Sequence, residues 1–117
     1  GSVWEAALFA SSKNLNNLYA IIDNNGWQGI GRNKDILDLS PLKKKWESFG
    51  WKTYVINGHN ENELKKIFKL KKRVPTAIIA KTIKGKGVSF MEDDNNWHYR
   101  IPTKEEILIA QKELKIK

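Results

Sequence analysis

Two short turns carry the residues whose types and spacing could do chemistry. Asp23 to Gly26, DNNG, follows directly on the apolar run Leu18 to Ile22, and Lys84 to Gly87, KGKG, follows the apolar run Pro75 to Ile83. An acid and two amides beside a glycine, or lysines between glycines, make each turn a candidate anion or metal site. Asn-Gly is also an ordinary turn former, and glycines around a lysine form common flexible loops, so a structural role stays open for both.

Helices and strands that alternate along the chain are expected to position these turns. Helical spacing and cap residues predict the helices, and short continuous apolar runs predict the strands. The helices are expected over Val3 to Ser12, from Ser40-Pro41 to Gly50, after the capping pair Asn60 and Glu63, and after the capping pair Thr103 and Glu106; the strands are expected at Leu18 to Ile22, Trp51 to Ile56 and Pro75 to Ile83.

The fold class expected from this order is α/β, with a parallel sheet and helices on both faces. Strands that are apolar on both sides and alternate with helices are typical of such sheets. Parallel sheets bind ligands beyond the carboxyl ends of their strands. Asp23 to Gly26 and Lys84 to Gly87 are therefore expected at the ligand-binding edge.

Composition narrows the class of protein further. The 117 residues are 40% hydrophobic, which is enough for one compact unit with a core. A net charge of +8 favours anionic partners, although a solvated lysine surface explains it equally well. No cysteine is present, which excludes disulfides and thiolate sites. No apolar run approaches the ~20 residues of a membrane span, so a cytoplasmic protein without a membrane partner is expected.

Three segments, in order, resemble the transketolase family. They are GSVWEAALFASSKNLNNLYAIIDNNGWQ from Gly1, NGHN from Asn57, and TIKGKGVSFMEDDNNWHY from Thr82. The resemblance implies the domain that binds the diphosphate of thiamine diphosphate, similar to the amino-terminal subunit of split transketolases. In that family a strand ending in Gly-Asp-Gly precedes the position of Gly1. Residues 1–117 are therefore expected to be the C-terminal portion of the domain, incomplete at its N-terminal side.

The resemblance also assigns roles around the cofactor. Asn25 would supply its side-chain oxygen and Trp27 its main-chain carbonyl to Mg²⁺ or Ca²⁺, and an aspartate of Gly-Asp-Gly would complete the protein ligands. Asp23 and Asn24 would hydrogen-bond the turn itself. Close to the cofactor lies a loop in which small residues permit backbone approach, and its matching residues are Ile83, Gly85 and Gly87.

Two further residues match the family's functional positions. Glu5 aligns with a glutamate in a hydrogen-bonded network near the cofactor and the subunit interface, although it could be a solvated surface acid. His98 aligns with a histidine near the cofactor's terminal phosphate and the substrate, although it could simply pack on Trp97. Tyr99 stands where the family commonly has glycine, which affects the loop and the substrate fit. His59 is expected to be structural.

The activity implied is two-carbon ketol transfer between sugar phosphates. The pyrimidine end of the cofactor would be held by a second transketolase subunit or domain, and the remainder of this domain would lie upstream of Gly1. A dimer or heterotetramer is expected, and the isolated chain is expected to be inactive.

Alternative functions remain. Other thiamine-diphosphate enzymes, such as deoxyxylulose-phosphate synthase or dehydrogenase first components, share the cofactor motif, and a transketolase for specialised sugar biosynthesis or a degenerate structural subunit is also open. A non-catalytic module could bind nucleic acid through Lys43 to Lys45 and Lys65 to Lys72. No nucleic-acid partner is expected, because aromatic residues are not interleaved with these lysines.

Overall fold

The computed structural model describes residues 1–116, which form two compact units rather than the single unit that the chain length predicts. The first unit comprises Gly1–Asn24 and Leu39–Thr82. The second comprises Asn25–Asp38 together with residues 83–116. Each unit is built from two distant segments because the segments of each unit bond to one another.

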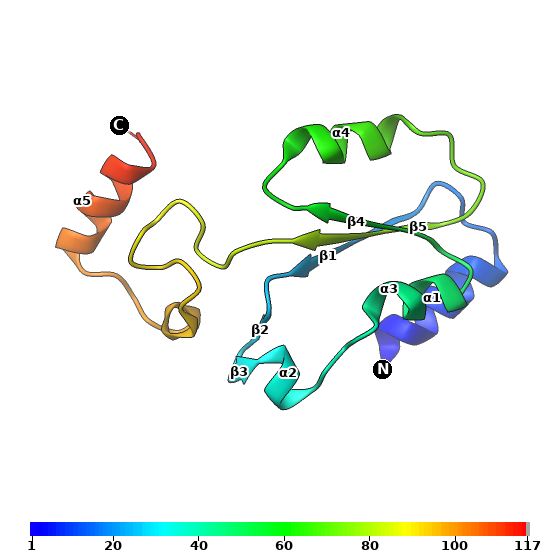
Figure 1. Ribbon diagram of the computed structural model, residues 1–117, viewed down its shortest axis with the longest axis horizontal. Coiled ribbons are helices and arrows are strands. Elements are labelled where there is room, and N and C mark those ends of the chain that lie inside the picture. The colour runs from blue at the N-terminus through cyan, green and yellow to red at the C-terminus, as the bar shows by residue number, and fades with distance from the viewer. Residues whose placement is uncertain (117) are drawn as a thin grey trace. The chain divides into compact units, whose positions relative to one another are not determined.

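A parallel sheet of three strands organises the first unit, which confirms the expected α/β fold. Its strands are β1 (Tyr19–Asn24), β4 (Lys52–Asn57) and β5 (Thr76–Lys81), in the order β1-β5-β4. Figure 1 shows their arrows pointing in the same direction. The register pairs Asn24 with Lys81 and Lys81 with Asn57, so all three strands end at one edge.

Strand β5 lies in the centre because its sequence, TAIIAK, is small or apolar on both faces. Its first five residues are buried, and Ala77 and Ile78 are fully inaccessible. In β1 and β4 the side chains are only partly covered, as expected for strands with a single neighbour in this sheet. The continuous apolar run thus predicted the strand that is buried on both sides.

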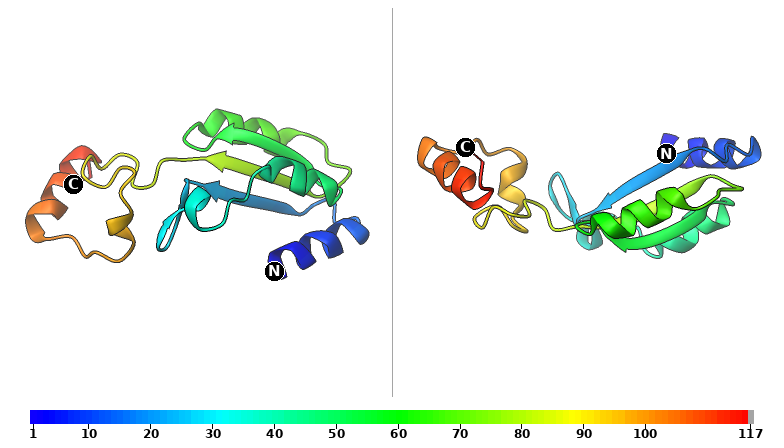
Figure 2. Two further views of the ribbon diagram at one scale, coloured as in Figure 1. Left: turned by 60° about the horizontal axis from the view of Figure 1, so that its bottom comes forward. Right: turned by 90° about the horizontal axis from the view of Figure 1, so that it is seen from above.

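Helices cover both faces of the sheet, as Figure 2 shows. On one face lie α1 (Ser2–Ser12) and α3 (Leu42–Ser48), and on the other lies α4 (Glu61–Lys69). The first face buries the residues Ala7, Ala10, Trp46, Trp51, Ala77 and Ile79; the second buries Ile56, Ile67, Ile78 and Ala80. The indole Nε1 of Trp51 donates a buried hydrogen bond of 2.9 Å to the carbonyl oxygen of Ala7, which joins α1 to the start of β4.

The helix caps agree with the sequence at two of three places. Thr103 forms a complete capping box with Glu106 at α5 (Lys104–Glu113), and the side chain of Asn60 caps α4. The predicted cap at Ser40 is wrong: α3 begins at Leu42, with Pro41 in an extended N-cap conformation and no side-chain cap bond. Gly50 ends this segment with φ +83°, as its position predicts.

The second unit contains a short hairpin and three small helical elements. The hairpin pairs β2 (Trp27–Gln28) with β3 (Gly31–Arg32) and continues into α2 (Asn33–Ile36). The segment from residue 83 contributes the 3₁₀ helix η1 (Asn95–His98) and α5. Within residues 1–116, no helix is long and apolar enough to cross a membrane.

Candidate functional site

The carboxyl ends of β1 and β5 lie side by side, which fixes where the two candidate turns begin. The hydroxyl of Thr82 donates to a carboxylate oxygen of Asp23, and the N–H of Thr82 lies 3.5 Å from the carbonyl oxygen of Asn24. Asp23 therefore bonds to the neighbouring strand end. Both turns leave adjacent points of one sheet edge, as the parallel arrangement predicts.

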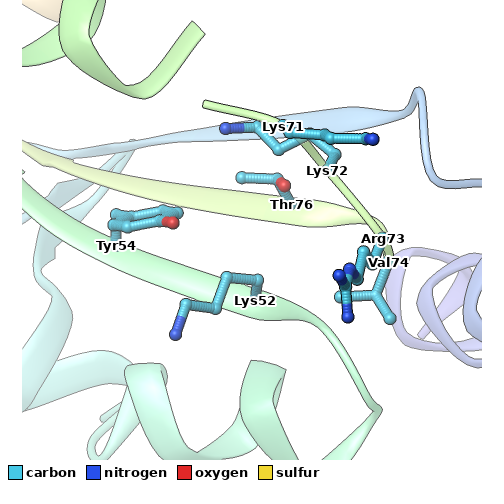
Figure 3. Close-up of a pocket in the computed structure, with 7 residues that line it drawn as sticks. All are labelled: Lys52, Tyr54, Lys71, Lys72, Arg73, Val74 and Thr76. Carbon is cyan, nitrogen blue, oxygen red and sulfur yellow. The ribbon is translucent and has the colours of Figure 1, made fainter. Parts of the chain in front are cut away.

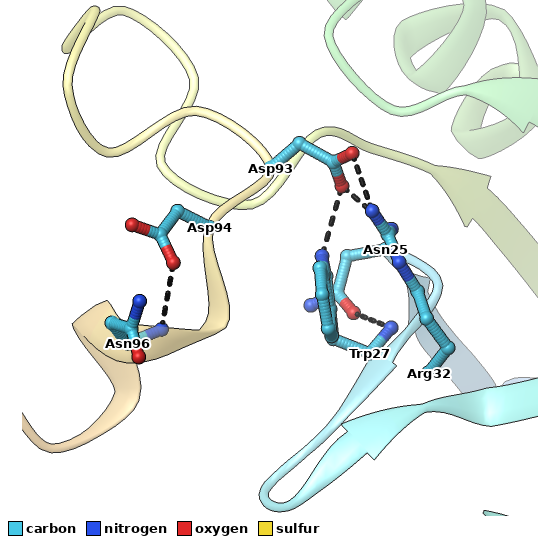
Figure 4. A network of polar contacts seen from close by, with 6 residues as sticks. All are labelled: Asn25, Trp27, Arg32, Asp93, Asp94 and Asn96. Carbon is cyan, nitrogen blue, oxygen red and sulfur yellow. Dashed lines mark hydrogen bonds and ion pairs between the residues drawn. The ribbon is translucent and has the colours of Figure 1, made fainter. Parts of the chain in front are cut away.

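Asn25 itself makes the hydrogen bond that orders its turn. Its side-chain Oδ1 accepts from the N–H of Trp27 at 2.9 Å, and Gly26 between them has φ +81° (Figure 4). This is an Asx-type turn, in which a short amide side chain replaces a backbone acceptor. The sequence assigned this bonding to Asp23 and Asn24, and the structure gives it to Asn25. An amide oxygen has two lone pairs, so one remains for a ligand.

A three-residue clamp fixes this turn to a distant loop of the same unit. Asp93 accepts from Nε1 of Trp27 at 2.9 Å and from both terminal nitrogens of Arg32, at 2.7 and 2.6 Å. The Arg32 guanidinium also stacks over the Trp27 ring, with its carbon 3.6 Å from the ring centroid. The Trp27–Arg32–Asp93 clamp of Figure 4 thus holds Trp27, one of the two proposed metal ligands, by its side chain.

Sequence reasoning missed Arg32 and Asp93 because their partnership spans 61 residues. An arginine in one turn and an acid in another give no local signal of pairing. The hydrogen bond from Arg32, followed by that from Trp27, lowers the pKa of Asp93 to about 2. The same bond raises the pKa of Arg32.

This shift predicts how the clamp responds to acid. Because the pKa of Asp93 is lowered on folding, its stabilisation is complete above the ordinary value of 3.8 and is lost as pH falls toward about 2. We expect an NMR titration of the Asp93 carboxyl group to give a midpoint well below that ordinary value. Substitution Asp93→Asn is expected to remove this contribution to the acid limb of the stability curve. A midpoint near the ordinary value would contradict the clamp.

Two glycines shape the loop that follows β5. Gly85 and Gly87 have φ of +73° and +97°, a region that disfavours residues with a Cβ. Glu92 accepts from the N–H of Gly87 at 3.0 Å and forms an ion pair with Lys86 at 3.2 Å. The charge of Lys86 is therefore balanced within the loop, whereas the sequence suggested added positive potential. Ile83, at the start of the loop, is 41% exposed.

His98 lies against the same turn, at the end of η1. A Cβ built on Gly29 would be 3.3 Å from His98 Nε2, and Asn95 Nδ2 donates to the Gly29 carbonyl oxygen at 3.2 Å. The His98 ring meets Tyr99 edge-on at a centroid distance of 4.5 Å. Its expected packing on Trp97 is not what the structure shows, because Trp97 stacks on Phe90 instead.

The predicted site residues thus divide between the two units. Asn25, Trp27, His98 and the loop of residues 83–87 all belong to the second unit. Glu5 is an exposed residue in the first turn of α1, in the first unit. His59 follows β4, where its N–H is bound by Asn57 Oδ1 at 3.0 Å, in keeping with a structural role.

The donors at the turn match the chemistry of a hard divalent cation. An amide oxygen at Asn25 and a carbonyl at Trp27 are oxygen ligands of the kind that Mg²⁺ and Ca²⁺ accept. A Cβ on Gly26 would meet only Arg32, at 3.7 Å, so the backbone here is approachable. The described residues contain no cluster of three or more His, Cys, Asp or Glu, so a carboxylate ligand would have to come from outside them.

Comparison with known proteins agrees with the fold. The family described as "Transketolase, thiamine diphosphate binding domain" matches residues 1–117. One of the two subunits of an apulose-4-phosphate transketolase from Actinobacillus succinogenes is 40% identical over 120 residues, which cover 98% of this chain and 42% of that protein. Human transketolase is 45% identical over 105 residues, which cover 84% of this chain and 16% of that protein.

The solved structures give the same result. Transketolase from Campylobacter jejuni superposes with a TM-score of 0.83 at 27% identity, covering 97% of this chain and 18% of that chain. The chain therefore spans less than half the length of these relatives. A family match over the entire chain, together with this fold, shows that the chain belongs to the transketolase family and forms part of its thiamine diphosphate binding domain.

Proposed function

We propose that this chain supplies part of the diphosphate and metal site of an enzyme that transfers two-carbon ketol groups between sugar phosphates. The observation that carries the proposal is the Asn25–Trp27 turn. It follows the carboxyl end of β1, is closed by the Asn25 side chain, and is held by the Asp93 clamp. A rigid pair of oxygen donors in a domain that binds thiamine diphosphate suits a metal ion bridging to the diphosphate.

Each residue of the second unit has a role in this proposal. Asn25 Oδ1 and the Trp27 carbonyl oxygen bind Mg²⁺ or Ca²⁺. The backbone at Ile83, Gly85 and Gly87 lies against the cofactor, since two of these positions lack a Cβ. His98 donates a hydrogen bond to a phosphate or to charge that develops on the donor sugar. When bound, thiamine diphosphate supplies the nucleophilic carbon and the electron sink for the two-carbon fragment.

Assembly with other polypeptide completes the site in this proposal. The relative from Actinobacillus succinogenes is named as a transketolase subunit, which supports a separate pyrimidine-binding partner. Edge strand β1 bonds only to β5 in the described sheet, and its Ile21 is 58% exposed, which suits coverage by the remainder of the same domain upstream of Gly1. Glu5, exposed on α1, would join a hydrogen-bonded network at the subunit interface. The whole would be a dimer or heterotetramer.

Donor consumption by the assembled enzyme, meaning the intact protein with its pyrimidine-binding partner, tests this function. We expect a ketose phosphate to be consumed with an aldose phosphate as acceptor, and pyruvate to be left unchanged. The 117-residue chain alone is expected to show no turnover. Consumption of pyruvate without ketose would instead indicate an enzyme like deoxyxylulose-phosphate synthase.

A transketolase for a specialised sugar is the second candidate. The similarity to the apulose-4-phosphate transketolase favours it, as does Tyr99, a bulky and 75% exposed residue that contacts His98. A panel of ketose and aldose phosphates, including branched sugars, separates the two candidates by their relative kcat/KM. Higher kcat/KM for unbranched pentose and hexose phosphates would support a general transketolase.

A further inference from the structure

A basic pocket lies at the amino end of the sheet in the first unit. Its volume is about 390 Å³, within the range of small-molecule sites. The lining residues that matter here are Lys52, Tyr54, Lys71, Lys72, Arg73 and Thr76. Four of them are cations, and no acidic residue is among the described residues that line it. The pocket therefore has an uncompensated positive charge.

A buried hydroxyl without a partner lies at the floor of this pocket. Thr76 is fully buried, and its Oγ1 has no hydrogen-bond partner among the residues that the structure describes. Figure 3 shows Thr76 in the middle of the pocket, between Lys71 and Lys72 on one side and Tyr54 and Lys52 on the other. Leaving a buried hydroxyl unpaired is unfavourable, so this atom indicates a missing ligand.

Lys72 is held in place beside that hydroxyl. Its Nζ donates to the Ile67 carbonyl oxygen and lies 5.6 and 5.7 Å from the rings of Tyr19 and Tyr54. Partial burial lowers the pKa of Lys72. An anion in the pocket would offset this desolvation, because a nearby negative charge favours the protonated amine.

We infer that this pocket binds the phosphate group of a small phosphorylated ligand, with Arg73, Lys71 and Lys72 as charged contacts and the Thr76 hydroxyl as a buried hydrogen-bonding group. Arginine and lysine are the side chains that bind phosphate best, and a hydroxyl can donate to a phosphate oxygen. The half-buried Tyr54 ring and Val74 leave an apolar surface for the organic part of the ligand.

The pocket is separate from the proposed cofactor site. Lys52 and Thr76 are the first residues of β4 and β5, whereas the proposed site follows the carboxyl ends of the strands. The six residues of β5 span about 17 Å at about 3.3 Å each. Binding here would not require thiamine diphosphate, so it can be tested whether or not the proposed function holds.

Calorimetric titration of the intact protein with inorganic phosphate, at constant ionic strength, tests the pocket. We expect saturable binding that chloride does not reproduce, with and without thiamine diphosphate and Mg²⁺. Substitution Thr76→Val is expected to weaken phosphate binding about three- to tenfold and Arg73→Gln about tenfold or more. Without phosphate, Thr76→Val should keep or raise the melting temperature, because it removes an unpaired buried hydroxyl.

Matched controls keep this test sharp. Thr53→Val alters a buried threonine on another strand whose Oγ1 already bonds the Trp51 carbonyl oxygen, and Lys69→Gln removes a nearby cation that does not line the pocket. Both should bind phosphate like the unaltered protein. Titrations with a sugar phosphate and a nucleoside monophosphate then identify the source of the phosphate by affinity. Absence of phosphate binding, or equal binding by Thr76→Val, would overturn the inference.

Discussion

Replacing Asn25 with alanine is expected to weaken thiamine diphosphate binding to the assembled enzyme by at least about tenfold. The substitution removes the proposed metal ligand Oδ1 and the acceptor of the Trp27 N–H, now bonded at 2.9 Å. The Mg²⁺ concentration needed for half-maximal binding should rise in parallel, because cofactor and metal occupy one linked site. Tryptophan fluorescence during cofactor titrations at several Mg²⁺ concentrations measures both quantities.

Three further variants separate metal binding from turn formation. Asn25→Asp retains an oxygen for the metal and for the turn, and should keep most of the affinity. Asp93→Asn loosens the clamp on Trp27 without removing either proposed ligand, so its effect should be smaller than that of Asn25→Ala. Asn24→Ala changes a neighbouring amide for which no ligand role is proposed. If Asn25→Ala bound the cofactor with unchanged Mg²⁺ dependence, the proposed metal site would be wrong.

Gly85→Ala is expected to be the most destabilising change in the loop after β5. Gly85 has φ +73°, where an alanine costs about 1–2 kcal/mol. In addition, its Cβ would lie 2.4 Å from the carbonyl oxygen of Met91, a backbone atom that cannot rotate away. Relieving such overpacking typically costs a further 1–3 kcal/mol or so. Chemical denaturation of the intact protein measures the loss in unfolding free energy.

Gly87→Ala is the matched control for this contact. Gly87 also has positive φ, +97°, but its Cβ would meet only the end of the Leu114 side chain, at 3.2 Å. Its substitution should therefore cost about the conformational term alone. Equal losses for the two variants would show that the Met91 contact relaxes freely. A larger loss for Gly85→Ala, accompanied by weaker cofactor binding, would show that the loop conformation is needed at the site.

The sequence by itself determined the strands, most helix ends and the chemical character of the turn. Apolar runs predicted β1, β4 and β5 to within one or two residues at each end, and the capping residues Asn60 and Thr103 predicted α4 and α5. These features depend on neighbours along the chain, so local patterns carry them. Resemblance to the transketolase family added the candidate roles of Asn25, Trp27 and His98.

Only the tertiary structure decided which side chains meet. The pairing of Arg32 with Asp93, the contact of His98 with Tyr99 and Gly29, and the unpaired hydroxyl of Thr76 are not visible as local patterns. Each depends on how distant segments pack, and most single substitutions at such positions would leave the sequence periodicity unchanged. The physical reason is that hydrophobic periodicity specifies which face of an element is buried, whereas polar partners are chosen by the geometry of the folded chain.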